Sequence, residues 1–158
     1  MFRPMRRKSK EIGAEAAEAL LVSARRGVLA VNGDGGYPYA VPINYYYDGE
    51  TRKIYFHGSR AGHKADALKK NEKVCFSVTG EEMIRDEAWA PYLQSVVVFG
   101  LCHPVTEPEK AGVVLRKFAM KYYPDEQTAQ AEIEASGKAV QMYEIMIEHI
   151  SGKEIQEK

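Results

Sequence analysis

From Gly27 onward, the sequence is a succession of short apolar runs separated by strong turn signals. The run from Val28 to Val31 ends in Asn32-Gly33-Asp34-Gly35-Gly36, and Asp48-Gly49 turns the chain a second time. Runs joined by tight turns, without regular alternation of strand and helix, favour an antiparallel barrel or sandwich over a doubly wound parallel sheet. We therefore predict about six mostly antiparallel strands, covering residues 28–31, 37–47, 54–57, 74–79, 93–102 and a last run with Tyr143, Ile145 and Ile147.

Two segments interrupt this pattern. Pro38 and Pro42 fall inside the second run, and proline removes a donor from the ladder, so this strand is predicted to lie at an edge or to carry a bulge. Residues 81–91 are predicted to form an irregular excursion with the only tryptophan, Trp89. Trp89 and Tyr92 are therefore candidates for covering a ligand pocket.

Helical periodicity occurs at the beginning, middle and end of the chain. Residues 9–23 have apolar side chains at helical spacing, with Ser9 as the predicted N-cap and Gly27 as the stop. A short helix is predicted over about residues 64–70. Thr106 to Glu109 match a capping box that opens a helix ending near Tyr122, and another helix follows over 127–136. The predicted fold is mainly β with flanking helices (α+β), in one domain over residues 1–158.

Composition and charge narrow the function classes. The 22 Lys and Arg residues balance the 22 Asp and Glu residues, so no net field directs the chain to nucleic acid or to a membrane. The exception is a basic N-terminal arm over residues 1–10, which we expect to be solvated, with phosphate or nucleic-acid contact as the alternative. No membrane span or signal peptide is predicted. Cys75 and Cys102 lie in apolar runs, which indicates reduced thiols and a cytoplasmic protein.

The segment from Ile54 to Lys64 holds the clearest candidate site. A strand ends there, glycines free the backbone, and cations collect where a helix begins. The helix N-terminus offers unpaired N–H groups, Ser59 adds a hydroxyl, and Arg60 and Lys64 add charge, as a phosphate cradle requires. The alternative is an ordinary strand-to-helix turn with solvated cations.

Two further segments are compatible with a ligand. Residues 39–45 form a strand against which a planar molecule could lie, although the same residues also fit a core strand with outward tyrosines. Residues 92–100 are mostly apolar, which suggests burial on both faces as in a barrel wall or subunit interface, and Gln94 and Ser95 near the start either bind a ligand or satisfy a strand end. His57 and His63 lack a third ligand at diagnostic spacing, so no metal site is predicted.

In their order and spacing, these segments resemble the FMN-binding split-barrel superfamily that includes pyridoxamine 5′-phosphate oxidase. Within it, the chain is most similar to the nitroimidazole-resistance (Nim) reductase branch. The resemblance covers nearly the whole chain and rests on Met5-Arg6-Arg7, Gly27-Val28-Leu29-Ala30, residues 38–45, Ile54-Tyr55-Phe56-His57-Gly58, Gly62-His63-Lys64, residues 95–100 and Ile150-Ser151-Gly152-Lys153.

The resemblance implies a six-stranded antiparallel split β-barrel that forms a homodimer with two FMN sites in the interface. It places Pro42, Ile43 and Asn44 beside the isoalloxazine ring, and His57, Gly58 and Ser59 along the ring and ribityl chain. It places His63 and Lys64 at the phosphate, next to the Arg60 of the predicted cradle. Ser95 and Val96 match a strand that also touches the cofactor, and His57 matches the active-site histidine.

The function expected from this resemblance is an FMN-dependent oxidoreductase that takes electrons from an external donor and reduces a small molecule such as a nitroaromatic compound. His57 would supply a proton, directly or through water. A non-catalytic FMN-binding module for storage or redox sensing is the alternative. A pyridoxamine 5′-phosphate oxidase is disfavoured, because Gln94-Ser95-Val96-Val97 stands where that branch has Arg-Gln-Val-Arg. Sibling branches also leave haem or a deazaflavin open in place of FMN.

Overall fold

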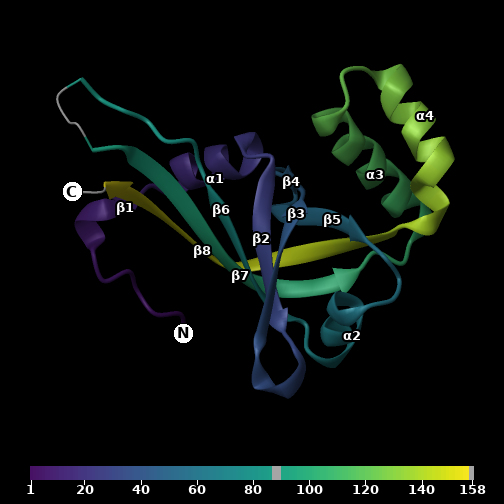
Figure 1. Ribbon diagram of the computed structural model, residues 1–158, viewed down its shortest axis with the longest axis horizontal. Coiled ribbons are helices and arrows are strands. Elements are labelled where there is room, and N and C mark those ends of the chain that lie inside the picture. The colour runs from purple at the N-terminus through teal and green to yellow at the C-terminus, as the bar shows by residue number, and fades with distance from the viewer. Residues whose placement is uncertain (87–89, 157–158) are drawn as a thin grey trace.

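The computed structural model describes residues 1–86 and 90–156, and its strands form one antiparallel sheet (Figure 1). Trp89, which the sequence analysis gives as a candidate for covering a ligand pocket, lies outside the described residues. The strands are β1 (Glu11–Ile12), β2 (Arg26–Asn32), β3 (Pro38–Asn44), β4 (Tyr46–Asp48), β5 (Lys53–Gly58), β6 (Lys73–Thr79), β7 (Tyr92–Pro104) and β8 (Gln141–Gln156). The α-helices are α1 (Ala14–Ser23), α2 (His63–Lys70), α3 (Pro108–Tyr122) and α4 (Glu126–Ser136).

The sheet is organised around the long strands β7 and β8. The strand order is β3-β2-β6-β7-β8-β5-β4, with β1 attached to β8. The register of β7 against β8 shifts between Phe99 and Gly100, where Glu148 is the extra residue on β8. At this bulge Gly100 lies directly against the main chain of Met146, so a Cβ atom has no room there. A bulge bends the strand that carries the extra residue, here β8, and the sheet forms an open barrel.

The predicted mainly β fold, with helices at the start, middle and end, is confirmed. The six predicted strands correspond to the longer observed ones, but the predicted run 37–47 is divided into β3 and β4 at Tyr45. The short strand β1 was not predicted. The prediction of an edge strand from its prolines is confirmed, because β3 is paired on one side only, by β2.

The predicted start of the first helix was wrong. Ser9 lies in a short 3-10 turn over Lys8–Lys10, and α1 begins at Ala14. The intervening β1 pairs with β8, where Ile12 faces Gly152 and fills the space that a larger residue would occupy. This tertiary pairing outweighs the helical pattern. The helix ends at Ser23, as predicted, and Ala24 rather than Gly27 is its C-cap.

The predicted capping box of α3 was also wrong. Glu107 is the N-cap, and no side chain caps this helix through a hydrogen bond. Pro108 in the first turn fixes the start instead. The following helix, α4, is capped by Asp125, whose Oδ1 accepts the Thr128 N–H at 2.7 Å.

Two apolar clusters stabilise the fold. The larger one fills the barrel and includes the stacked rings of Phe56 and Tyr143, whose centroids are 5.1 Å apart. The smaller one lies between α3 and the outer face of β5 and β8, where Tyr55 and Met142 pack against Val114. The helices α3 and α4 thus form a lobe on one side of the sheet (Figure 1).

The first residues of the chain extend along the sheet. The ring of Phe2 stacks on His149, with 4.8 Å between centroids, and on Phe99, at 5.8 Å. The basic side chains of the arm are mostly exposed, as expected for a solvated segment. Among the described residues, no helix combines the length and the hydropathy that a membrane crossing requires.

The end of α3 clamps the corner between β3 and β4. The Tyr122 hydroxyl accepts the Tyr45 N–H at 2.9 Å and lies 2.5 Å from Tyr45 O and 2.6 Å from Arg25 O. The Lys121 ammonium group donates to Ala24 O at 2.6 Å and to Tyr45 O at 3.1 Å. One helix end therefore ties the corner to the segment between α1 and β2.

We predict that Tyr122→Phe lowers the free energy of unfolding by about 1–3 kcal/mol, because it leaves partly buried main-chain groups of the corner without a partner. Urea unfolding followed by circular dichroism measures this loss. Tyr123→Phe is the matched control, since Tyr123 makes no side-chain hydrogen bond within the described residues. A Tyr122→Phe protein that unfolds at the wild-type urea concentration would show that the clamp adds nothing.

Candidate functional site

The candidate site lies where the barrel stays open between β3 and β5. These strands approach each other, but they do not pair. The short strand β4 covers only Lys53 to Tyr55 of β5, so His57 and Gly58 have a free edge on this side. Main-chain groups on two such edges are available to the rim of a ligand, as they are in strand addition.

Lys64 lies at the start of α2 and faces the end of β5. Its Nζ is 5.3 Å from the centre of the Phe56 ring, and a Cβ placed on Gly58 would lie 3.1 Å from Nζ. The residue is half-buried, and burial lowers the pKa of its ammonium group. Within the described part of the chain, Lys64 has no hydrogen-bond or ion-pair partner. A desolvated cation without a counter-charge fits the predicted binding of an anion.

The loop before α2 contributes in a different way. Ser59 Oγ accepts the Ala61 N–H at 3.3 Å, so the serine orders the turn while its own hydroxyl proton stays available. Arg60 is exposed, and its Nη1 donates to Gln141 Oε1 at 3.4 Å. Both residues thus border the start of α2, as the cradle prediction requires.

His63 points away from Lys64, toward the turn between β2 and β3. Its ring stacks on Tyr39, with centroids 4.1 Å apart, and its Nε2 accepts the Asp34 N–H at 3.3 Å. Neighbouring residues on a helix point in directions about 100° apart, which explains the separation. A role of His63 at a phosphate stays a prediction, and its observed contacts fix α2 to the β2–β3 hairpin.

His57 is exposed on the outer face of β5, at the border of the α3 lobe. It pairs across the ladder with Met142, and its ring meets the Phe118 ring edge-on at 5.0 Å. Partial burial lowers the pKa of His57, and the positive charge of Lys64 lowers it further. Phe118 was not found by sequence reasoning, since it lies on a helix far along the chain and no local pattern links it to His57.

The residues predicted on β3 divide between two environments. Pro42 and Asn44 are exposed, whereas Ile43 is 9% exposed and packs inside the barrel. Asn44 Oδ1 accepts the Arg26 Nε–H at 3.1 Å, a contact that the sequence did not reveal. A ligand along this edge would therefore meet the main chain of β3 and the Asn44 side chain rather than Ile43.

Ser95 and Val96 lie at the far end of the sheet. Ser95 is opposite Lys153 on β8, whereas His57 is opposite Met142 on the same strand. The eleven residue steps from Met142 to Lys153 correspond to about 35 Å of extended strand. Val96 is fully buried, so its side chain faces the core. The chain therefore does not bring Ser95 next to Lys64.

The described residues contain no group of three or more His, Cys, Asp or Glu side chains arranged for a metal ion. The two cysteines are free, and burial raises the pKa of Cys102 to about 12, so it stays a protonated core residue. The chemistry of the site thus rests on His57, Lys64 and the free strand edges.

We predict that Lys64→Gln raises the pKa of His57, because it removes a nearby positive charge that disfavours the imidazolium form. An NMR titration of the histidine ring protons measures this shift. Lys69→Gln removes an exposed charge from the last turn of the same helix and should leave His57 unchanged. Equal His57 titration curves in both variants would contradict the proximity of Lys64 and His57.

Comparisons with known proteins agree with this architecture. A family model described as pyridoxamine 5′-phosphate oxidase matches residues 13–154. No curated protein matches the chain significantly.

Several solved structures share the fold. A candidate 5-nitroimidazole antibiotic resistance protein from Bacteroides thetaiotaomicron is 18% identical, with a TM-score of 0.77 over 92% of this chain and 87% of that one. An FAD-binding protein from Mesorhizobium loti is 24% identical, with a TM-score of 0.67 over 92% and 97%. The flavocytochrome Anf3 from Azotobacter vinelandii is 20% identical, with a TM-score of 0.75 over 96% and 72%. With the family match over nearly its whole length, the chain belongs to the pyridoxamine 5′-phosphate oxidase family.

Proposed function

We propose that this protein is an FMN-dependent reductase that acts on small nitroaromatic molecules and binds FMN at the interface of a homodimer. The observation that carries the proposal is the uncompensated Lys64 ammonium group beside Gly58, at the open side of the barrel. Membership of a flavin-binding family and the fold shared with named flavin-binding proteins support it.

The residues at the opening fit a flavin mononucleotide. Lys64 and the first N–H groups of α2 would hold the single phosphate, with Ser59 and Arg60 beside them. The free edges of β3 and β5 would bind the polar rim of the ring through main-chain groups. Gly58 keeps the strand end close to Lys64, because a side chain there would displace the ammonium group.

The homodimer of this proposal is supported by the position of the residues that the family resemblance assigns to the cofactor. Ser95 and Lys64 lie at opposite ends of one sheet, so both touch the same cofactor only if they come from different chains. The sheet also has exposed apolar side chains, Val28 on β2 and Phe99 on β7. A second copy would cover them and enclose the ring.

When bound, FMN supplies the electron transfer, with electrons from an external donor. The protein positions the reacting groups and supplies protons to the substrate. Phe118 holds the His57 ring at the border of the opening, so that its imidazole can deliver a proton to the reduced substrate, directly or through water. Because the pKa of His57 lies below its usual value, this delivery should become faster as the pH falls toward the acidic range.

The free thiols support a cytoplasmic location as part of the proposal. Cys75 and Cys102 form no disulfide, and Cys102 is buried in the barrel core. Reduced thiols of this kind are typical of reducing compartments.

We predict that Lys64→Gln weakens FMN binding about ten- to hundredfold and leaves riboflavin binding nearly unchanged, since riboflavin lacks the phosphate. Fluorescence titration of the flavin measures both affinities. The variant should keep the wild-type mass in light scattering, which separates cofactor loss from dimer loss. Lys69→Gln is the matched control.

Equal losses for FMN and riboflavin would show that Lys64 does not hold the phosphate. Protein that purifies without colour and does not take up added FMN would end the flavin proposal. A monomeric mass for the wild-type protein would exclude the shared site.

We predict that His57→Ala retains FMN but slows the reoxidation of the reduced protein by a nitroimidazole at least tenfold under anaerobic conditions. Stopped-flow absorbance measures the rate, and product analysis with excess external donor shows whether the nitro group is reduced to the amine, which takes six electrons. His103→Ala, which changes a surface histidine beside Glu72, is the control. Equal rates in wild type and His57→Ala would remove His57 from the mechanism. Absence of reoxidation in the wild type would instead favour a module that only stores or senses flavin.

A further inference from the structure

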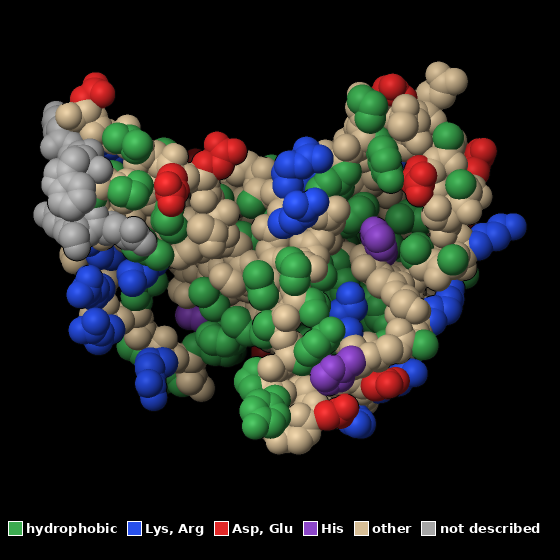
Figure 2. Space-filling model, viewed as in Figure 1, with side chains coloured by type: hydrophobic (Ala, Val, Ile, Leu, Met, Phe, Trp, Pro, Cys, Tyr) green, Lys and Arg blue, Asp and Glu red, His purple; other side chains and the backbone are tan. Residues whose placement is uncertain are grey.

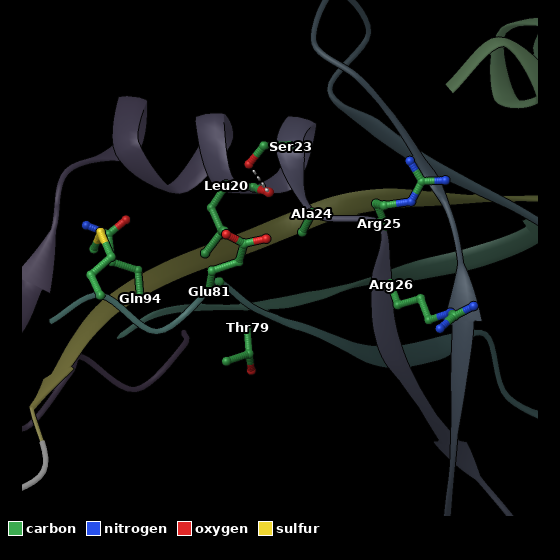
Figure 3. A pocket seen from close by; sticks show the side chains of 10 residues that line it. Leu20, Ser23, Ala24, Arg25, Arg26, Thr79, Glu81 and Gln94 are labelled. Atoms are coloured by element: carbon green, nitrogen blue, oxygen red, sulfur yellow. Dashed lines mark hydrogen bonds between the residues drawn. The ribbon is translucent and has the colours of Figure 1, made fainter. Parts of the chain in front are cut away.

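A second cleft lies at the other end of β3 from α2. Its volume is about 640 Å³, which is within the usual range for small-molecule sites. The walls come from α1, the start of β2, the segment after β6 and the start of β7, so distant parts of the chain build it (Figure 3). Basic side chains lie in the hollow beside the lobe of α3 and α4 in the space-filling view (Figure 2).

Two arginines border one end of this cleft, and their side chains extend out of it toward Asn44 and the end of α3 (Figure 3). Arg26 Nε donates to Asn44 Oδ1 at 3.1 Å, and the Arg25 guanidinium lies over the Tyr122 ring at 5.0 Å from its centre. Within the described residues, neither arginine forms an ion pair with a carboxylate. The remaining guanidinium N–H groups are therefore free to bind an anion, and a carboxylate matches their fork geometry.

A third cation strengthens the positive potential at this end. The Lys121 ammonium group is held by Ala24 O and Tyr45 O. Burial lowers its pKa to about 8, and repulsion from Arg25 contributes. Because Lys121 is already fixed by two carbonyl groups, it adds charge without being the ligand's main contact.

The opposite wall carries different chemistry. Leu20 and Met83 are apolar, and Glu81 lines the same cleft without forming an ion pair to either arginine. Figure 3 shows the arginine side chains extending away from Glu81. The cleft therefore suits a molecule with an anionic group at one end and an apolar body, and Glu81 disfavours a second negative charge.

We infer that this cleft binds a small monoanion with an apolar body, and that Arg25 and Arg26 bind its carboxylate. The position of the cleft identifies the ligand's role. Asn44, which Arg26 contacts, ends the free edge of β3, and Tyr39, which stacks on His63 of α2, lies near the beginning of the same edge. A ligand whose body lies in the cleft would hold its carboxylate at the arginines, next to the Asn44 end of this edge. The role as substrate rests on the proposed function, whereas binding of the anion does not.

The test is isothermal titration calorimetry of the protein as purified with 4-nitrobenzoate and with the uncharged 4-nitrobenzamide. We expect 4-nitrobenzoate to bind more tightly, and its affinity to fall about tenfold in Arg26→Gln and further in the Arg25→Gln/Arg26→Gln double variant. Added salt should weaken the binding of 4-nitrobenzoate and leave the binding of 4-nitrobenzamide unchanged. Glu81→Gln should tighten 4-nitrobenzoate binding, since it removes a repulsive charge.

Arg116→Gln, on α3 and outside the cleft, is the matched control and should bind like wild type. Thermal unfolding of each variant shows whether the fold is retained. Equal affinities for the two probes, or wild-type affinity for 4-nitrobenzoate in the double variant, would overturn the inference. Colourless protein that still binds 4-nitrobenzoate through these arginines would refute the flavin proposal and leave the anion site standing.

Discussion

The pairing of β7 with β8 is the constraint on which the rest of the structure depends. The strands have 13 and 16 residues, and they run through both halves of the sheet. On one side of the bulge at Gly100 they carry β6 and β1, and on the other they carry β5. Because the bend lies between these halves, β3 and β5 come to face each other without pairing. The open side of the barrel is thus a consequence of strand length and of one glycine in the middle of the ladder.

Two half-buried lysines show how similar burial serves different roles. Lys121 is surrounded by main-chain oxygens, so its charge is satisfied within the fold and its role is structural. Lys64 is also desolvated, yet within the described residues it has no hydrogen-bond or ion-pair partner and lies near the face of Phe56 and the glycine at the end of β5. Burying a charge without a partner costs free energy, and an anionic ligand would recover part of this cost. The difference in partners, rather than burial itself, marks Lys64 as the candidate binding residue.

The sequence predicted those features that depend on local chemistry. The prolines of β3 correctly indicated an edge strand, since a residue without an N–H cannot complete an interior ladder. Features that depend on distant contacts were missed. The pairing of Ile12 with Gly152 replaces the first turns of the predicted helix, and no sequence pattern near Ile12 indicates this pairing.

The same limit applies to the candidate site. The position of Lys64 at a strand-to-helix junction was readable, but the contacts of His57 with Phe118 and of Asn44 with Arg26 join segments far apart in the chain.

The edge of β3 connects the two candidate sites. Its seven residues, Pro38–Asn44, span about 20 Å between the hairpin that holds His63 and the corner that Arg26 reaches. The clamp of Tyr122 and Lys121 fixes the corner end, and the stack of His63 on Tyr39 fixes α2 at the hairpin end. A flavin and a second ligand bound end to end along this edge would therefore have a cation at each end and main-chain groups between the cations. Since both ends are anchored by contacts from other elements, the distance between the cations is set by the fold and does not depend on the ligand.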